Sequence, residues 1–247
     1  MAGAARCDYL PPQCGMRKTL HKLVIGRGHP EGLQLHPTIR RRVENIKAIW
    51  NNEFEEDAGL EKLVRLILAA SQFLFPGMYI KHLFWRKGPL YQDLATEVFV
   101  LLKTAFPLAV LLLGYEDHGL VIALVVWLVL ETVLYIPTLI FASDTFGSPR
   151  SYRRSTLLLF LNYIEVVLSY AVIYKAGQFL NQPLTDPVQA LYFSAVTSST
   201  IGFGDLFPVT RAGRLLVVSE SLFYFSYIVL FINFFSFRLK RGYFRDH

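Results

Sequence analysis

The chain has 247 residues, of which 53% are hydrophobic, and its formal net charge is +6 at neutral pH. So high an apolar fraction excludes an ordinary soluble domain of this length and predicts an all-α membrane protein with several transmembrane helices. The basic excess fits cytoplasmic loops better than a nucleic-acid surface, so no nucleic-acid partner is expected. Its two cysteines, Cys7 and Cys14, lack a metal-ligand spacing and are expected to be reduced cytosolic thiols.

Residues 1–57 are polar and predict a cytoplasmic N-terminal region without a cleavable signal peptide. Within this region, residues 38–55 have the spacing of an amphipathic helix. The apolar stripe of this helix is predicted to be Ile39, Val43, Ile46, Trp50 and Phe54. The basic triplet at residues 40–42 is favoured as a solvated face, with contact to anionic lipid headgroups as the alternative.

Residues 58–92 predict an interfacial amphipathic segment. The apolar part, Leu66 to Ile80, is short for a span and is interrupted by Gln72 and by Pro76-Gly77. Basic residues flank it on both sides, which is typical of a helix lying in the cytoplasmic interface. A fifth span is the alternative, but a full crossing would place the basic N-terminus outside the cell.

Four longer apolar stretches predict membrane spans. The two peripheral spans, within residues 93–145, are expected at about 94–115, with a kink at Pro107, and at about 119–142, with Pro137 near the inner end. The last two spans are expected at about 155–175 and 212–237. They bound a carboxy-terminal module, residues 155–238, which a short cytoplasmic tail at 239–247 follows.

Loop charges set the expected orientation. Arg150, Arg153 and Arg154 lie between the second and third spans, and the tail is basic, whereas the loop between the first two spans is Glu116-Asp117-His118. The positive-inside rule therefore places both termini in the cytoplasm of a multi-pass protein. No span carries arginines at every third residue, so no voltage-sensor helix is predicted.

Charged residues also fall inside the apolar spans: Lys103, Glu131, Glu165 and Glu220. Such residues are costly in a bilayer and usually face the interior of a helix bundle. Glu131 and Glu165 are expected at similar depths, and Lys103 can pair with one of them. We favour a structural role for this pairing, with a gating or proton-sensing carboxylate as the alternative.

A short helix is predicted between the last two spans. Asp186 is a suitable N-cap, Pro187 suits the first helical position, and the following residues 188–199 are too few to cross a membrane. This segment is therefore expected to be re-entrant. The negative end of its dipole would favour a cation at its carboxy terminus.

Residues Ser199-Thr200-Ile201-Gly202-Phe203-Gly204-Asp205 follow this helix. Successive carbonyls can point at one axis if some residues adopt positive φ, which Gly202 and Gly204 do cheaply. The Thr200 hydroxyl can add an oxygen at the inner end of this column. Ile201 and Phe203 are expected to point away from the axis, and Tyr192 with Phe193 to form an aromatic layer behind Phe203.

From Ser155 onward the chain resembles tetrameric potassium channels of the pore-loop cation channel family, in particular small bacterial ones. The resemblance rests on the Thr-Ile-Gly-Phe-Gly run, which is similar to a potassium selectivity filter, and on residues 205–210 and 213–215, which resemble an outer mouth. It implies a hydrogen bond between Asp205 and Tyr192. Phe203 replaces the commoner tyrosine, and Tyr224 stands where the inner helix usually has a hinge glycine.

The resemblance implies a homotetrameric pore that conducts dehydrated K⁺, the permeant ion, without other cofactors. The implied K⁺ ligands are Thr200, Ile201, Gly202, Phe203 and Gly204. The expected filter supports are Ser199, Asp205, Tyr192, Phe193 and Glu220. Glu220 is expected to hydrogen-bond the pore helix. The cavity below is expected to be lined by Ser221, Phe225, Ile228 and Ile232. The expected location is the cell membrane, and the compact architecture suggests a bacterial inner membrane with lipid as the other partner.

Two further functions remain open. A non-selective cation channel usually has an altered aromatic-glycine pair, which is intact here as Phe203-Gly204. A membrane adaptor could bind a partner through its N-terminal region, although nothing in the sequence requires one. No enzyme is expected, because no nucleophile-base pair, phosphate loop or metal-ligand cluster is found outside the membrane. The gating stimulus is not identified.

Overall fold

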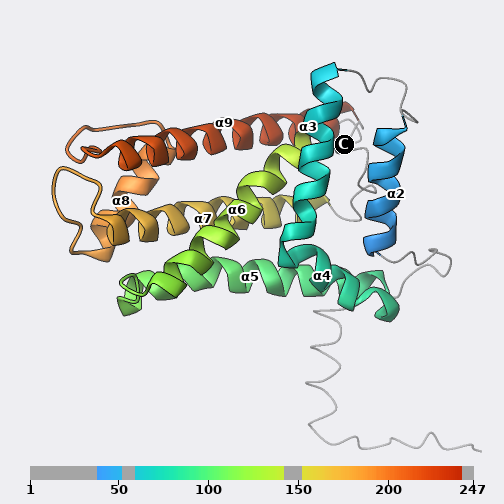
Figure 1. Cartoon of the computed structure of the whole chain (residues 1–247), viewed down its shortest axis with the longest axis horizontal. Helices are drawn as coiled ribbons and strands as arrows, with labels where there is room; N and C mark the ends of the chain where they lie inside the picture. The colour runs from blue at the N-terminus through green and yellow to red at the C-terminus, as the bar shows by residue number, and fades with distance from the viewer. Residues whose placement is uncertain (1–37, 52–58, 142–151, 241–247) are drawn as a thin grey trace, which may run out of the picture.

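A computed structural model describes residues 38–51, 59–141 and 152–240, and this part of the chain is helical with no strand (Figure 1). The predictions for Cys7, Cys14, Phe54, Arg150, Arg241 and Arg245 lie outside the described residues. The long helices are α5 (Pro89–Leu113), α6 (Gly119–Phe141), α7 (Tyr152–Gly177) and α9 (Arg211–Lys240). Shorter elements are α2 (Thr38–Trp50), α3 (Gly59–Ser71), η1 (Gln72–Leu74), α4 (Pro76–Leu83), η2 (Trp85–Lys87) and α8 (Pro187–Ser198).

The four long helices are apolar and long enough to cross a membrane, as predicted. The membrane-spanning part of α7 is 61% buried, against 22–33% for the other three spans. It contacts α5, α6, α8 and α9, and is therefore the central helix of the chain. Most of the residues in the other three spans are therefore not buried within the single chain.

The two peripheral spans have nearly the predicted limits. Helix α5 begins at Pro89, whose fixed φ suits a first turn, and ends at Gly114, which adopts the left-handed conformation (φ 72°). Pro107 and Pro137 lie within α5 and α6, and each helix continues past its proline. An acidic turn of only a few residues, with Glu116, joins the two spans.

The segment predicted as one interfacial helix over Leu66 to Ile80 is instead a bent pair. The break falls at Phe75-Pro76, where the helix axis bends by 66°. Pro76 cannot continue α3, because it lacks the N–H donor and restricts the residue before it. Figure 1 shows α3 running across the cluster of spans rather than alongside α5 and α9. By length and composition the pair could be a broken span or a re-entrant loop.

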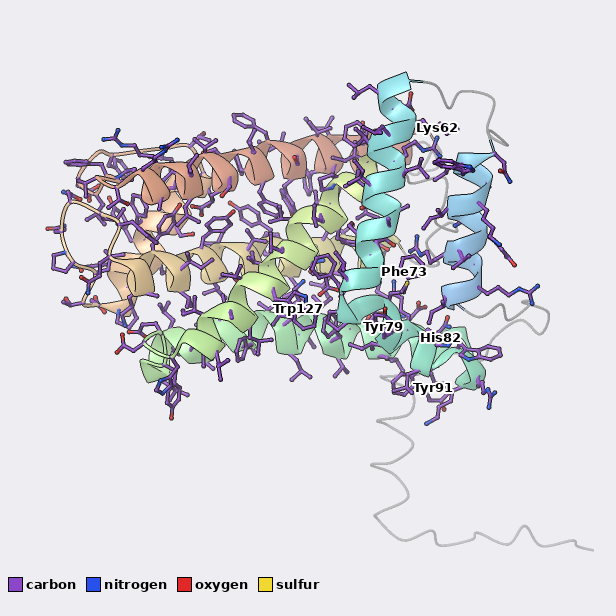
Figure 2. All side chains as sticks on the ribbon, viewed as in Figure 1. Lys62, Phe73, Tyr79, His82, Tyr91 and Trp127 are labelled. Carbon is purple, nitrogen blue, oxygen red and sulfur yellow. The ribbon has the colours of Figure 1, made fainter. Side chains whose placement is uncertain are left out.

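Helix α2 is amphipathic, but its buried face was predicted wrongly. Val43 and Trp50 are exposed, at 37% and 69%, whereas Ile49 is fully buried. The reason is its packing against α3 and α4, which covers the side of α2 that holds Arg42 and Ile49. Lys62, labelled in Figure 2, donates from α3 to the Trp50 carbonyl (2.8 Å) and so links the two helices.

Candidate functional site

The short helix α8 forms where the sequence places it. The Asp186 side chain accepts a hydrogen bond from the Val188 N–H (3.2 Å), and Pro187 occupies the first turn. Such caps satisfy amide donors that a helix start leaves free. Helix α8 packs between α7 and α9, so its position is fixed by the two spans that flank it in sequence (Figure 1).

Past α8 the backbone alternates in handedness. Thr200, Gly202 and Gly204 have positive φ, at 59°, 56° and 79°, whereas Ile201 and Phe203 do not. Positive φ at Thr200 was not predicted, and it is uncommon for a residue with a side chain. The Ile201 N–H still bonds to the Val196 carbonyl (3.1 Å), which holds the start of this segment against the end of α8.

The alternating segment is exposed on one face of the single chain. Ile201 and Phe203 are 59% and 69% exposed, and nothing lies within 4 Å of a Cβ placed on Gly202 or Gly204. Backbone this exposed would be unsatisfied in a bilayer unless it faced water or other copies of the protein. The open side of this segment therefore needs water or protein next to it.

An aromatic stack and a carboxylate support the segment from behind. The rings of Tyr192 and Phe203 stack, with centroids 6.4 Å apart and planes 4° apart. Desolvation and a side-chain hydrogen bond to Asp205 raise the pKa of Tyr192, so its hydroxyl remains protonated and donates. Phe193 does not join this layer as predicted. It is buried and packs edge-on against Tyr174 of α7, with centroids 4.8 Å apart.

Asn181 holds the residues that follow the alternating segment by hydrogen bonds, a role that was not predicted from the sequence. Its side-chain amide donates to the Asp205 carbonyl (3.2 Å) and accepts from the Phe207 N–H (3.0 Å). Its backbone N–H bonds to the Phe207 carbonyl (3.0 Å), next to the antiparallel bridge between Leu180 and Pro208. These contacts join the segment that follows α7 to residues 205–208. No local sequence pattern around Asn181 predicts a contact with residues so far along the chain.

The start of α9 explains a glycine in the predicted outer-mouth motif. The Thr210 hydroxyl accepts from the Gly213 N–H (3.0 Å), as an N-cap does. A Cβ on Gly213 would lie 2.7 Å from the Phe179 Cβ, too close for any side chain. Glycine therefore allows α9 to approach the segment that leaves α7.

Glu220 of α9 hydrogen-bonds the pore helix, as predicted. Its carboxylate accepts from the Ser194 hydroxyl of α8 (2.6 Å) and from the Tyr174 hydroxyl of α7 (2.8 Å), and the residue is fully buried. Both oxygens are thus satisfied, which is what a buried carboxylate requires. Three helices meet at this carboxylate, directly behind the alternating segment. Nearby, the Tyr163 hydroxyl of α7 donates to the Ser198 hydroxyl at the end of α8 (3.2 Å), another contact that was not predicted.

The exposed face of α9 is displaced slightly from the predicted cavity lining. Phe225 and Ile232 are exposed, but Ser221 and Ile228 are only partly exposed and lie beside the main stripe. That stripe consists of Leu215, Val218, Leu222, Phe225, Val229 and Ile232. Helix α9 runs unbroken past Tyr224, whose ring lies 6.5 Å from that of Tyr163. The role of these residues in lining a cavity stays a prediction.

The charged residues within the spans form one cluster. The Lys103 ammonium lies 3.3 Å from a Glu131 carboxylate oxygen and 3.9 Å from one of Glu165, so it pairs with both predicted partners. It also donates to the Thr132 hydroxyl, which in turn donates to Glu165 (2.7 Å). Lys103 and Glu165 are almost completely buried. The cluster therefore joins α5, α6 and α7.

A short helix that enters between two spans and ends in an exposed segment of alternating handedness defines a pore-loop ion-channel module. Residues 158–241 match the family model described as "Ion channel". This match, together with two curated relatives that are potassium channels, supports a likeness to the pore-loop potassium channel family. This agrees with the resemblance noted from the sequence, and it points to a kind of protein that is not an enzyme.

Two curated relatives match part of the chain. A hyperpolarization-activated voltage-gated potassium channel of Methanocaldococcus jannaschii is 26% identical over 78 residues, which are 31% of this chain and 37% of that protein. The voltage-gated potassium channel Kch of Escherichia coli is 31% identical over 74 residues, which are 29% of this chain and 18% of that protein. The chain thus spans well under half the length of either relative. No solved structure matches the chain.

Proposed function

We propose that this protein is a potassium-selective channel in which four copies surround one conduction path. The observation that carries the proposal is the positive φ at Thr200, Gly202 and Gly204, with Ile201 and Phe203 between them. Alternation of this kind lets successive carbonyls face the same side of the backbone. A column of such carbonyls can replace the hydration shell of K⁺.

The proposed filter ligands are the carbonyls of Thr200, Ile201, Gly202, Phe203 and Gly204. Carbonyl oxygens on one side of one chain cannot surround an ion, so closed symmetry must supply the others. The exposure of this segment, and of the apolar stripe on α9, leaves a surface for three further copies. K⁺ is then the permeant ion and not a resident cofactor.

The proposed gating does not use a voltage sensor, although both relatives bear the name voltage-gated. The family model matches residues 158–241, and the peripheral spans α5 and α6 contain a single basic residue, Lys103. A voltage sensor needs several mobile charges, and a single ammonium that is paired and buried does not supply them. With the positive-inside orientation, both termini are cytoplasmic and the filter opens outward.

Flux from proteoliposomes tests the proposal. The native protein should pass K⁺ and exclude Na⁺, whereas Gly202→Ala should abolish flux, because alanine is strained at φ 56°. Gly119→Ala is the matched control, since Gly119 begins α6 with open space around its Cβ position. Its flux should equal that of the native protein.

Other results would separate the alternatives. Equal K⁺ and Na⁺ flux that Gly202→Ala abolishes would establish a non-selective cation channel. The absence of flux from a folded tetramer, with binding of a cellular partner through residues 1–57, would establish an adaptor. A native protein that never forms a tetramer would overturn the proposed pore.

A further inference from the structure

A cavity of about 110 Å³ lies beside the Lys103 cluster. Helices α2, α4, α5, α6 and α7 all contribute to its walls. One buried water needs only roughly 10–15 Å³ by this measure, so the cavity has room for a small polyatomic group. With the proposed orientation, its walls are the cytoplasmic halves of α5, α6 and α7, together with residues of α2 and α4.

The charged side chains that line the cavity are unequal in number. Arg42, Lys81 and Lys103 carry positive charge, whereas Glu131 is the one carboxylate of the described lining. That carboxylate is already engaged, since one oxygen accepts from the Gly77 N–H (3.0 Å) and the other pairs with Lys103. Cationic side chains therefore outnumber carboxylates in the described lining of the cavity.

Two donors at this cavity lack a partner among the described residues. No hydrogen bond or ion pair within the described ranges reaches the Lys81 ammonium, and the buried Gln72 side-chain nitrogen also has none. Asp93 and Glu131 attract Lys81 from beyond ion-pair distance, while Arg42 repels it. Two cations and an unsatisfied amide placed together at low dielectric are costly unless an anion joins them.

We propose that this cavity binds a phosphate group, with the Lys81 ammonium and the Gln72 amide as donors and Arg42 as a second positive charge. Phosphate oxygens are strong acceptors that suit such a set of charged and neutral donors. The phosphate could belong to an anionic lipid headgroup or be free in solution. The lipid source is favoured by position, because anionic lipids of the cytoplasmic leaflet lie at this depth.

The surface beside the cavity also fits a lipid. η1 and α4 both contribute to the cavity wall, and on these elements Leu74 and Leu83 are 68% and 74% exposed. Figure 2 shows Phe73 and Tyr79 at the same corner of the molecule, where α3 turns into α4. An acyl chain can cover these side chains while the phosphate enters among the donors. Bound there, the lipid would connect α2 and α4 to the peripheral spans.

Ligand binding to the full-length protein in a neutral detergent tests the proposal without measuring ion flux. The probes are dioctanoyl phosphatidylglycerol, dioctanoyl phosphatidylcholine and inorganic phosphate at constant ionic strength. Native mass spectrometry and the thermal unfolding midpoint are the readouts. We expect phosphatidylglycerol to bind and stabilise the native protein more than phosphatidylcholine does.

Three variants assign the binding to the cavity. Lys81→Gln should weaken phosphatidylglycerol binding by about tenfold or more, the usual effect of losing a charged hydrogen-bond donor, and Lys81→Arg should retain most of it. Lys87→Gln, the same change at an exposed site on η2, should leave binding within about twofold of native. Without ligand, Lys81→Gln should unfold at or above the native midpoint, because it removes an unpaired charge.

The possible results distinguish a lipid ligand, a soluble phosphate ligand and the absence of a phosphate site. Binding of inorganic phosphate that equals that of phosphatidylglycerol, and depends equally on Lys81, would support the site with a soluble ligand. Equal response to both lipids and none to phosphate would show that the cavity holds only water, and would overturn the proposal. Unchanged binding by Lys81→Gln would also overturn it. A failure here leaves the proposed K⁺ conduction untouched, because conduction is tested at Gly202.

Discussion

Glu131 accepts a hydrogen bond from the Gly77 N–H of α4 with one carboxylate oxygen, at 3.0 Å, while its other oxygen pairs with Lys103 of α5. A single side chain of α6 thus links the bent α3 and α4 segment to the charged cluster between the spans. Because Lys103 also reaches Glu165 of α7, the link extends to the central helix of the pore module.

Removing the cluster's cation should destabilise the protein strongly. Lys103→Met leaves the buried Glu165 carboxylate without its compensating charge, at a cost of about 3–5 kcal/mol in unfolding free energy. The double variant Lys103→Met/Glu165→Gln should recover part of this loss, because Glu165 then carries no charge while Glu131 still lacks its cation. Thermal unfolding in detergent measures both effects. Should Lys103→Met assemble normally and only shift the open probability with pH, the cluster would be a sensor and not a structural link.

Gly77 should not tolerate a side chain. A Cβ at this position would lie 2.5 Å from the Glu131 carboxylate oxygen, so Gly77→Ala must displace either α4 or that carboxylate. We expect a loss of about 1–3 kcal/mol and faster hydrogen exchange along α4. Gly119→Ala, in open space, is the control. Native exchange rates in Gly77→Ala would mean that Glu131 does not hold α4.

The Glu220 site should stabilise the position of the pore helix. Tyr174→Phe deletes one of the two hydroxyl donors to the buried carboxylate, and should cost about 1–3 kcal/mol. Thermal unfolding provides the measurement, with Tyr91→Phe, at a 44% exposed tyrosine of α5, as the matched control. Equal midpoints for these two variants would contradict the proposed support of α8 by this carboxylate.

An ion pair between Glu116 and Lys175 (2.7 Å) should make stability depend on acid pH. Desolvation raises the pKa of Glu116, but the hydrogen bond and charge of Lys175 outweigh it and lower that pKa below its ordinary value of 4.5. A carboxyl whose pKa is lowered by folding contributes stability above its unfolded value, and loses it as pH falls through the folded value. We therefore expect the thermal unfolding midpoint of the native protein to decrease when the pH is lowered below about 4.5.

The variant Glu116→Gln should be less stable than the native protein at pH 7 and lose less on acidification. Asp117→Asn, at the exposed neighbouring residue, should leave the native pH profile unchanged. Parallel pH profiles for Glu116→Gln and the native protein would show that this pair adds nothing to stability.

The periodicity and caps of the sequence were sufficient to predict the spans and the pore helix. Apolar runs of more than 20 residues have few other stable forms in a bilayer, and the Asp186-Pro187 start is a strong local signal. The apolar stripe predicted for α2 did not identify its buried side, because a helix with apolar residues on more than one side can bury either. Its contacts with α3 and α4 decided that Ile49, and not Trp50, is buried.

Local residue types alone determined where backbone of alternating handedness could form, since Gly202 and Gly204 adopt positive φ without strain. The tertiary structure decided which distant groups support it. Asn181, Tyr174 and Tyr163 lie on or just beyond α7, and each reaches its partner only after α7, α8 and α9 have packed. The same packing brought Lys103 between Glu131 and Glu165. The spacing of residues in one segment predicts the secondary structure that this segment can form. Contacts between residues far apart in the sequence depend instead on how the helices pack.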